Sequence, residues 1–104
     1  MAFTTLPADF DATALAQDLV AAGLAACVNV LPAVTSIYRW KGKVEKDEER
    51  LLVIKTRAER FEALRQALVS LHPYEVPEVL ALPIAAGHQP YLDWLDESVK
   101  EGGG

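Results

Sequence analysis

The chain has 104 residues, of which 51% are hydrophobic, so its length and composition suit one domain with a real core. A net charge of −5 and the lack of a dense basic run argue against nucleic-acid binding, which depends on neutralising phosphates. The single cysteine excludes an internal disulfide, and the sequence shows neither a membrane-length apolar run nor a secretory signal. We therefore expect a cytoplasmic protein with one domain over residues 1–101 and a disordered glycine tail over residues 102–104.

The first predicted elements are a strand and a helix. Residues 2–6 predict a short edge strand, because Pro7 ends it and cannot donate to a sheet. A helix follows, capped by Asp9 or Asp11, and Gly23 provides a stop. Its apolar stripe has helical spacing and includes Leu15, Leu19 and Ala22.

Residues 36–56 predict a long β-hairpin. The strand that leads into it runs over residues 26–31, is interrupted at Pro32 and resumes over residues 33–40. The turn is Lys41-Gly42, since glycine adopts positive φ without steric cost.

The outgoing arm of this hairpin has two unlike halves. Residues 43–50 are mostly charged, so we expect water on both faces there. Residues 51–54 read Leu-Leu-Val-Ile and are apolar on both faces of a strand. An antiparallel sheet usually covers only one face, so a second copy of the chain is the simplest cover for the other.

The remaining elements are a helix, a strand and a final helix. Residues 56–59 fit a capping box, Thr with Glu three residues later, and Pro73 ends the helix that follows. One face of that helix is apolar through Phe61, Leu64, Leu68 and Leu71. Residues 78–84 predict another strand that is apolar on both faces, and Pro90 suits the first turn of the last helix.

The element order βαββαβ plus a C-terminal helix predicts an α+β fold of the ferredoxin-like sandwich type. In that fold an antiparallel sheet has two helices on one face. The other face then carries the apolar residues of two strands, which makes it the expected interface between copies.

The densest polar cluster is residues 72–78, His-Pro-Tyr-Glu-Val-Pro-Glu. One interpretation is a ligand or cation site held in preset geometry by two prolines. The other is a helix-to-strand connection in which the prolines set direction and Tyr74 packs. Residue chemistry alone favours the second interpretation, although loops often carry function.

The other chemically active side chains give weaker signals. Cys27 lies in an apolar strand and is expected to be a small buried hydrophobe rather than a ligand. His72 and His88 lack the spacing of a zinc site, and Tyr38 and Trp40 share a strand face as hairpin packing would require. No phosphate loop or nucleophile motif is present in the sequence.

Taken together, these segments resemble the divalent-cation tolerance (CutA) family over nearly the whole chain. The resemblance runs through residues 24–29, 36–43, 51–56, 72–78 and 91–94. It implies a ferredoxin-like protomer in a tight homotrimer, similar in outline to PII signalling proteins. It also implies a link to copper and other divalent metals, but no established enzymatic reaction.

The sequence departs from the family where copper ligands are concerned. Members credited with such ligands have a cysteine in the first strand and a His-His pair before Pro-Tyr. Here Thr4 and Leu71-His72 occupy those places, so only His72 of that set remains. The metal candidates are therefore His72 and Cys27, both weak, and a loosely held divalent cation such as Cu(II) is the only candidate cofactor.

These observations favour a trimeric, cytoplasmic, non-enzymatic protein that binds a cation or small ligand at clefts between subunits. The expected ligand-binding residues are Tyr38, Trp40, Lys55, His72, Tyr74, Glu75 and Glu78. One alternative is an enzyme whose site joins residues 72–78 to Tyr38, Trp40 or Lys55 of a neighbouring chain. Another is a scaffold whose charged hairpin tip, residues 41–50, docks a partner.

Overall fold

The computed structural model describes residues 1–99, and the predicted glycine tail lies outside them. The elements are β1 (Ala2–Pro7), α1 (Ala12–Ala21), β2 (Cys27–Trp40), β3 (Lys43–Lys55), the 3₁₀ turn η1 (Ala58–Arg60), α2 (Phe61–Leu71), β4 (Leu80–Ala81) and α3 (Gln89–Ser98). The strands form one sheet in the order β2-β3-β1-β4, and every pairing is antiparallel. The predicted ferredoxin-like α+β fold is confirmed.

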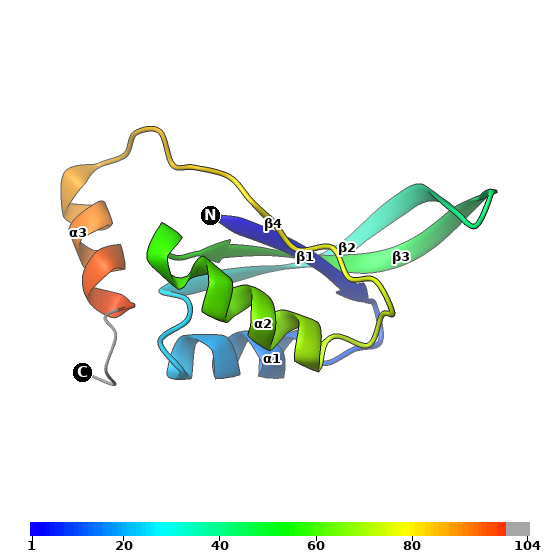
Figure 1. Ribbon diagram of the computed structural model, residues 1–104, viewed down its shortest axis with the longest axis horizontal. Coiled ribbons are helices and arrows are strands. Elements are labelled where there is room, and N and C mark those ends of the chain that lie inside the picture. The colour runs from blue at the N-terminus through cyan, green and yellow to red at the C-terminus, as the bar shows by residue number, and fades with distance from the viewer. Residues whose placement is uncertain (100–104) are drawn as a thin grey trace.

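The molecule has a two-layer body with projections at both ends. Figure 1 shows α1 and α2 beneath the sheet, the β2–β3 hairpin extending beyond it on one side, and α3 at the opposite end. Within residues 1–99, no helix has the length and apolar character that crossing a bilayer requires.

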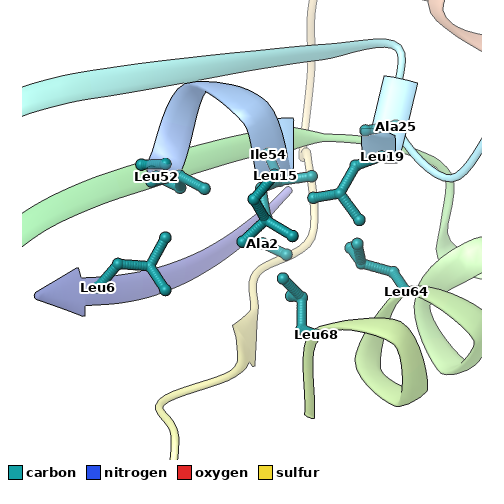
Figure 2. Close-up of a cluster of buried hydrophobic side chains, with 10 residues drawn as sticks. Ala2, Leu6, Leu15, Leu19, Ala25, Leu52, Ile54, Leu64 and Leu68 are labelled. Atoms are coloured by element: carbon teal, nitrogen blue, oxygen red, sulfur yellow. The ribbon is translucent and has the colours of Figure 1, made fainter. Parts of the chain in front are cut away.

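The core lies between the sheet and the two helices. Figure 2 shows its buried side chains converging from strands β1 and β3 and from helices α1 and α2. They include Ala2, Leu6, Leu15, Leu19, Leu52, Ile54, Leu64 and Leu68. Burying each large aliphatic side chain contributes about 1.5–3 kcal/mol, so this cluster is the main source of stability for one chain.

Local geometry explains how the hairpin forms. Lys41 has φ 50° and Gly42 has φ 80°, as a tight hairpin turn with two left-handed residues requires. The register between β2 and β3 shifts between Leu31 and Val34, which confirms the interruption expected at Pro32.

The first helix ends as the sequence predicts. The carboxylate of Asp11 accepts a hydrogen bond from the Ala14 amide, which makes Asp11 rather than Asp9 the cap. Gly23, with φ 74°, follows the helix and turns the chain toward β2.

Two strand predictions are wrong. The first strand is not an edge strand, because β1 pairs with β3 on one side and with β4 on the other. The strand expected over residues 78–84 shrinks to Leu80–Ala81. Pro77 and Pro83 flank this short strand, and neither can donate to a ladder of hydrogen bonds.

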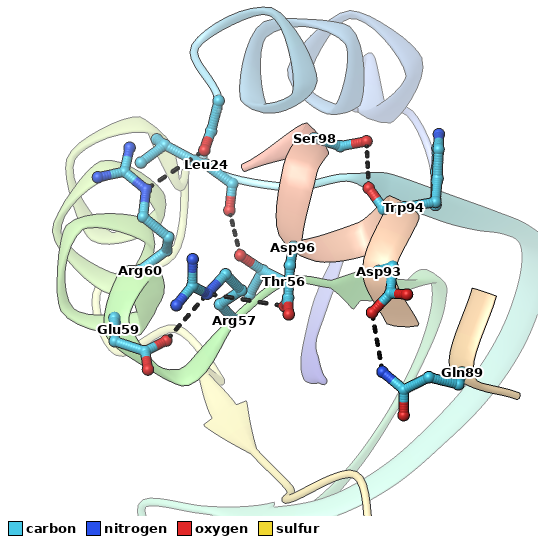
Figure 3. A network of polar contacts seen from close by, with 11 residues as sticks. Leu24, Thr56, Arg57, Glu59, Arg60, Gln89, Asp93, Trp94, Asp96 and Ser98 are labelled. Atoms are coloured by element: carbon cyan, nitrogen blue, oxygen red, sulfur yellow. Dashed lines mark hydrogen bonds and ion pairs between the residues drawn. The ribbon is translucent and has the colours of Figure 1, made fainter. Parts of the chain in front are cut away.

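The predicted capping box is also wrong. The hydroxyl of Thr56 donates to the Leu24 carbonyl at 2.8 Å instead of capping the next helix (Figure 3). Arg57 occupies the cap position of η1, and its guanidinium contacts Glu59 at 3.2 Å and Asp96 at 3.7 Å. This network joins the end of β3 to α3, and Leu95 and Val99 pack on Ala26 beside it.

Candidate functional site

His72 fixes the loop that follows α2 to the first strand. It is 8% exposed, and its Nε2 lies 2.7 Å from the Thr5 carbonyl oxygen, which can only accept. Its Nδ1 accepts a hydrogen bond from the Tyr74 amide at 3.1 Å. The ring is therefore the neutral Nε2–H tautomer, with both nitrogens engaged.

Tyr74 connects the same loop to strand β3 of the sheet. Its ring lies 4.8 Å from the His72 ring, and its hydroxyl donates to Glu49 Oε2 at 2.5 Å. Burial, followed by the hydrogen bond to the Glu49 carboxylate, raises the pKa of Tyr74 well above its usual range. The phenol therefore stays protonated and serves as a donor.

Glu49 corrects the expectation that residues 43–50 are wet on both faces. The residue is only 5% exposed, because it sits between Pro7 of β1 and Val34 of β2 in the paired sheet. Its side chain shares a face with those of Leu51 and Val53, since residues two apart on a strand point the same way. This alternation could have predicted from the sequence that Glu49 lies on the same face as Leu51 and Val53. The charged residues around Glu49 instead suggested that it faces water.

Tyr38 and Trp40 present aromatic rings on the same face of the hairpin. Both are 40% exposed. The Tyr38 hydroxyl donates to the Asp47 carboxylate, a diagonal neighbour across the hairpin. That hydrogen bond is the largest cause that raises the pKa of Tyr38 to about 12.

The hairpin and the loop enclose a hollow of about 400 Å³. We call it the hairpin hollow; it is lined by Thr5, Tyr38, Trp40, Glu49, Pro73, Tyr74, Glu75, Val76 and Glu78. Three of these residues are aromatic and three are carboxylates. Of the described residues that line it, none is basic. The arrangement is suited to attract a cation.

Most of the expected ligand-binding residues therefore lie around one hollow of a single chain, although the sequence predicted a site between subunits. Tyr38, Trp40, Tyr74, Glu75 and Glu78 line the hairpin hollow directly, and His72 supports it from behind. Sequence reasoning missed Thr5 and Glu49.

Lys55 does not belong to the hollow of its own chain. Its ammonium lies 6.0 Å from the centre of the Tyr91 ring, at the α3 end of the molecule. Its predicted role in the site of a neighbouring copy stays a prediction.

The two metal candidates lie apart. Cys27 is half-buried and lies opposite Lys55 in the register of β2 with β3. His72 is hydrogen-bonded to the carbonyl of Thr5, which lies opposite Leu51 in the register of β1 with β3. Leu51 and Lys55 are four residues apart on β3, which separates the two metal candidates by about 13 Å along the strand. Among residues 1–99, no group of three or more His, Cys, Asp or Glu side chains has the geometry to hold a metal ion.

A larger cavity of about 710 Å³ lies between α3 and the end of the sheet. Its lining is largely apolar, through residues such as Leu82, Ile84 and Leu92. Its charged residues contact one another, since Arg57 pairs with both Glu59 and Asp96. The hairpin hollow, whose three wall carboxylates make no ion pair within residues 1–99, is the better candidate for a polar ligand.

The fold and the hollow define the class of the protein: a small ferredoxin-like α+β domain with an acidic, aromatic-walled site. Comparison with known proteins then gives the family. The family model described as CutA1 divalent ion tolerance protein matches residues 1–98, so the chain belongs to this family.

Individual relatives agree with this assignment. The chain is 53% identical over 100 residues to the protein CutA homolog of Xenopus laevis, covering 96% of this chain and 66% of that one. It thus spans about two thirds of the length of the frog relative.

Solved structures also match over most of the chain. The divalent cation tolerance protein (Cut A1) of Thermus thermophilus superposes with a TM-score of 0.91 at 48% identity, covering 95% of this chain and 96% of that one. The protein named PII-like protein CutA from Nostoc sp. PCC 7120 gives 0.88 at 35% identity, covering 95% of both chains.

Proposed function

We propose that the chain acts in divalent-cation tolerance as a homotrimer that binds a small cation in the hairpin hollow and catalyses no reaction. The observation that carries the proposal is the hollow itself, whose described lining contains three carboxylates and no basic residue. The free Cys27 thiol is consistent with a reducing compartment, and we propose the cytoplasm.

The uncovered face of the sheet supports self-association. Val53, Phe3 and Leu80 lie directly opposite one another across β3, β1 and β4, on the face that α1 and α2 leave open (Figure 1). Leu80 is 58% exposed, and the neighbouring Leu82 is 52% exposed. Monomers rarely leave such a contiguous apolar patch in water.

The number of copies comes from the family resemblance, which implies three. If each protomer buries about 1,000 Å² of apolar surface, the gain is on the order of 25 kcal/mol before entropy costs. Thr5 and Glu49 share the open face with this patch, so the hairpin hollow borders the proposed interface.

The chemistry of the hollow supports binding rather than catalysis. The raised pKa values of Tyr38 and Tyr74 keep both phenols protonated near neutral pH, where neither serves as a general base. His72 has both nitrogens in hydrogen bonds and does not reach the hollow. Neither the two phenols nor His72 is therefore poised for proton transfer in the hollow, which supports binding rather than catalysis.

We expect divalent metals to bind weakly and with strong salt dependence. A trimer carries a formal charge of 3 × (−5) = −15, which gathers cations diffusely. Because both His72 nitrogens are engaged, its share in metal binding requires the loop to rearrange.

Calorimetric titration with Zn(II) and Cu(II) at low and high salt tests this. Glu49→Gln should weaken the binding that remains at high salt, whereas the matched Glu48→Gln, which faces the other way, should not. His72→Ala should remove at most a small remainder. Submicromolar binding that resists salt and survives Glu49→Gln would refute the proposed site.

A further inference from the structure

We propose that the ligand of the hairpin hollow is an organic cation of the diamine class, an alkyl chain with an ammonium group at each end. This inference rests on the proposed function, that the hollow takes a cation, and specifies which kind. It follows from the walls of the hollow, its buried carboxylate and its size.

The aromatic walls suit an organic cation. Trp40, Tyr38 and Tyr74 line the hollow from two sides, the first two from β2 and the third from the loop. An ammonium group over such a ring is attracted by its negative face. The Lys41 ammonium lies 5.6 Å from the centre of the Trp40 ring, within the range of a cation–π contact.

The rings are also held in place. The Tyr74 hydroxyl is tied to Glu49 and the Tyr38 hydroxyl to Asp47, so neither phenol rotates freely. A site that is ordered before binding loses less entropy when the ligand arrives. Methylene groups between two ammonium ends would pack against the ring faces and Val76.

Glu49 supplies a buried anchor in the lining of the hollow. It is 5% exposed and makes no ion pair within residues 1–99, although buried carboxylates are normally paired with a cation. The Tyr74 hydroxyl occupies Oε2, and Oε1 has no hydrogen-bond partner among the described residues. An ammonium group would supply a countercharge to Glu49 and a donor to Oε1.

Two further carboxylates of the lining are exposed. Glu75 and Glu78 are exposed and line the same hollow, so a second ammonium group would meet them at the mouth. A chain with charge at both ends therefore satisfies Glu49 and the mouth together, which a single small ion does not.

A bare metal ion fits the hollow less well. Metal binding needs several ligand atoms at fixed short distances, and none of the described residues forms a group of three suitable ligands. A hollow of about 400 Å³ with three aromatic walls offers contact area that a metal ion cannot use.

The test is calorimetric titration of the whole 104-residue chain at constant ionic strength. The probes are putrescine, a four-carbon diammonium, and 1,4-butanediol, which has the same length without charge. Zn²⁺ is titrated separately. The variants are Glu49→Gln and Trp40→Leu, with Glu48→Gln on the opposite face and Trp94→Leu on α3 as matched controls.

We expect putrescine to bind and butanediol not to bind. Glu49→Gln should weaken putrescine binding by at least about tenfold, because a charged hydrogen bond is lost. Trp40→Leu should weaken it by about fivefold, since leucine keeps the apolar bulk and removes the ring. Trp40 is exposed, so this variant tests the proposal even if Glu49→Gln disturbs folding. Both controls should bind as wild type.

Other results would separate the two proposals. If Zn²⁺ binds in a Glu49-dependent way and putrescine does not, the diamine assignment is wrong and the proposed function stands. If neither binds, both are wrong. Equal weakening by Glu48→Gln and Glu49→Gln would show diffuse charge attraction and would overturn the diamine site.

Discussion

The two faces of the sheet carry similar apolar side chains but differ in how far these are buried. On the helix side, Leu52 and Ile54 are fully buried by α1 and α2. On the other side, Leu51 and Val53 remain partly exposed, and Leu80 is 58% exposed. The same strand, β3, supplies both sets. One face is completed within the chain, and the other requires a surface that a single chain does not provide.

The open face also changes along its length. Near α3 it is apolar, through Phe3 and Val53, and toward the hairpin tip it becomes acidic and aromatic around Glu49 and Tyr38. The proposed subunit interface and the proposed ligand site thus lie on one face, with the border between them near Thr5. The residues of the proposed interface and those of the hollow are therefore neighbours on the same strands.

The strongest test of the comparison places a charge on each face. Leu52→Asp buries a carboxylate in the closed core and should prevent folding, whereas Val53→Asp, one residue away, should dissociate the assembly and leave a folded chain. Far-UV circular dichroism and light scattering distinguish these outcomes. Loss of helical signal in both variants would show that the open face belongs to the same core.

Truncation should give a smaller version of the same contrast. Leu52→Ala should lower the free energy of unfolding by about 2–5 kcal/mol at any protein concentration, because it leaves a cavity in the core. Val53→Ala should act mainly through assembly, so its destabilisation should depend on protein concentration. Denaturant titrations at two concentrations measure both effects. A concentration-independent loss at Val53 would count against an interface.

A still smaller effect is expected at Thr4. Its side chain is fully buried among apolar residues, and its hydroxyl has no hydrogen-bond partner among the described residues. Thr4→Val keeps the shape and removes the unsatisfied group, so it should raise the free energy of unfolding by about 1 kcal/mol. Thr4→Ser, which keeps the hydroxyl and loses the methyl group, should lower it. Destabilisation by valine would indicate a hidden partner for the hydroxyl.

The smallest effect concerns the exposed phenol of Tyr38. Its pKa is raised from 10.0 to about 12, chiefly by the hydrogen bond to Asp47. The contribution of this bond is fully present below about pH 10 and is lost as the pH rises through about 12. Carbon-13 NMR of labelled tyrosine should show this titration, and Asp47→Asn should move it back toward 10.0. An unchanged titration in Asp47→Asn would mean that the bond does not persist in solution.

Local patterns in the sequence predicted most of the fold. Helix periodicity placed Leu15 and Leu64 correctly in the core, and the Lys41-Gly42 pair located the hairpin turn. The place of β1 in the sheet could not be read locally, because Pro7 ends an internal strand as readily as an edge strand. The Thr56 hydroxyl likewise bonds a carbonyl 32 residues away rather than the neighbouring helix.

The candidate site was predicted only in part, because local composition marks the loop but not the strands that pack against it. Residues 72–78 stood out by composition, and the structure brings Tyr74, Glu75 and Glu78 to Tyr38 and Trp40. Glu49 was hidden in a charged run, and its burial depends on two neighbouring strands.

The most direct test of the central claim is the mass of the wild-type particle in solution. Light scattering after size exclusion at micromolar concentration should give three times the chain mass of 11.3 kDa, about 34 kDa. That result would show that other copies cover the open face. A stable particle near 11.3 kDa would contradict the account, because Phe3, Val53 and Leu80 would then face water in the native state.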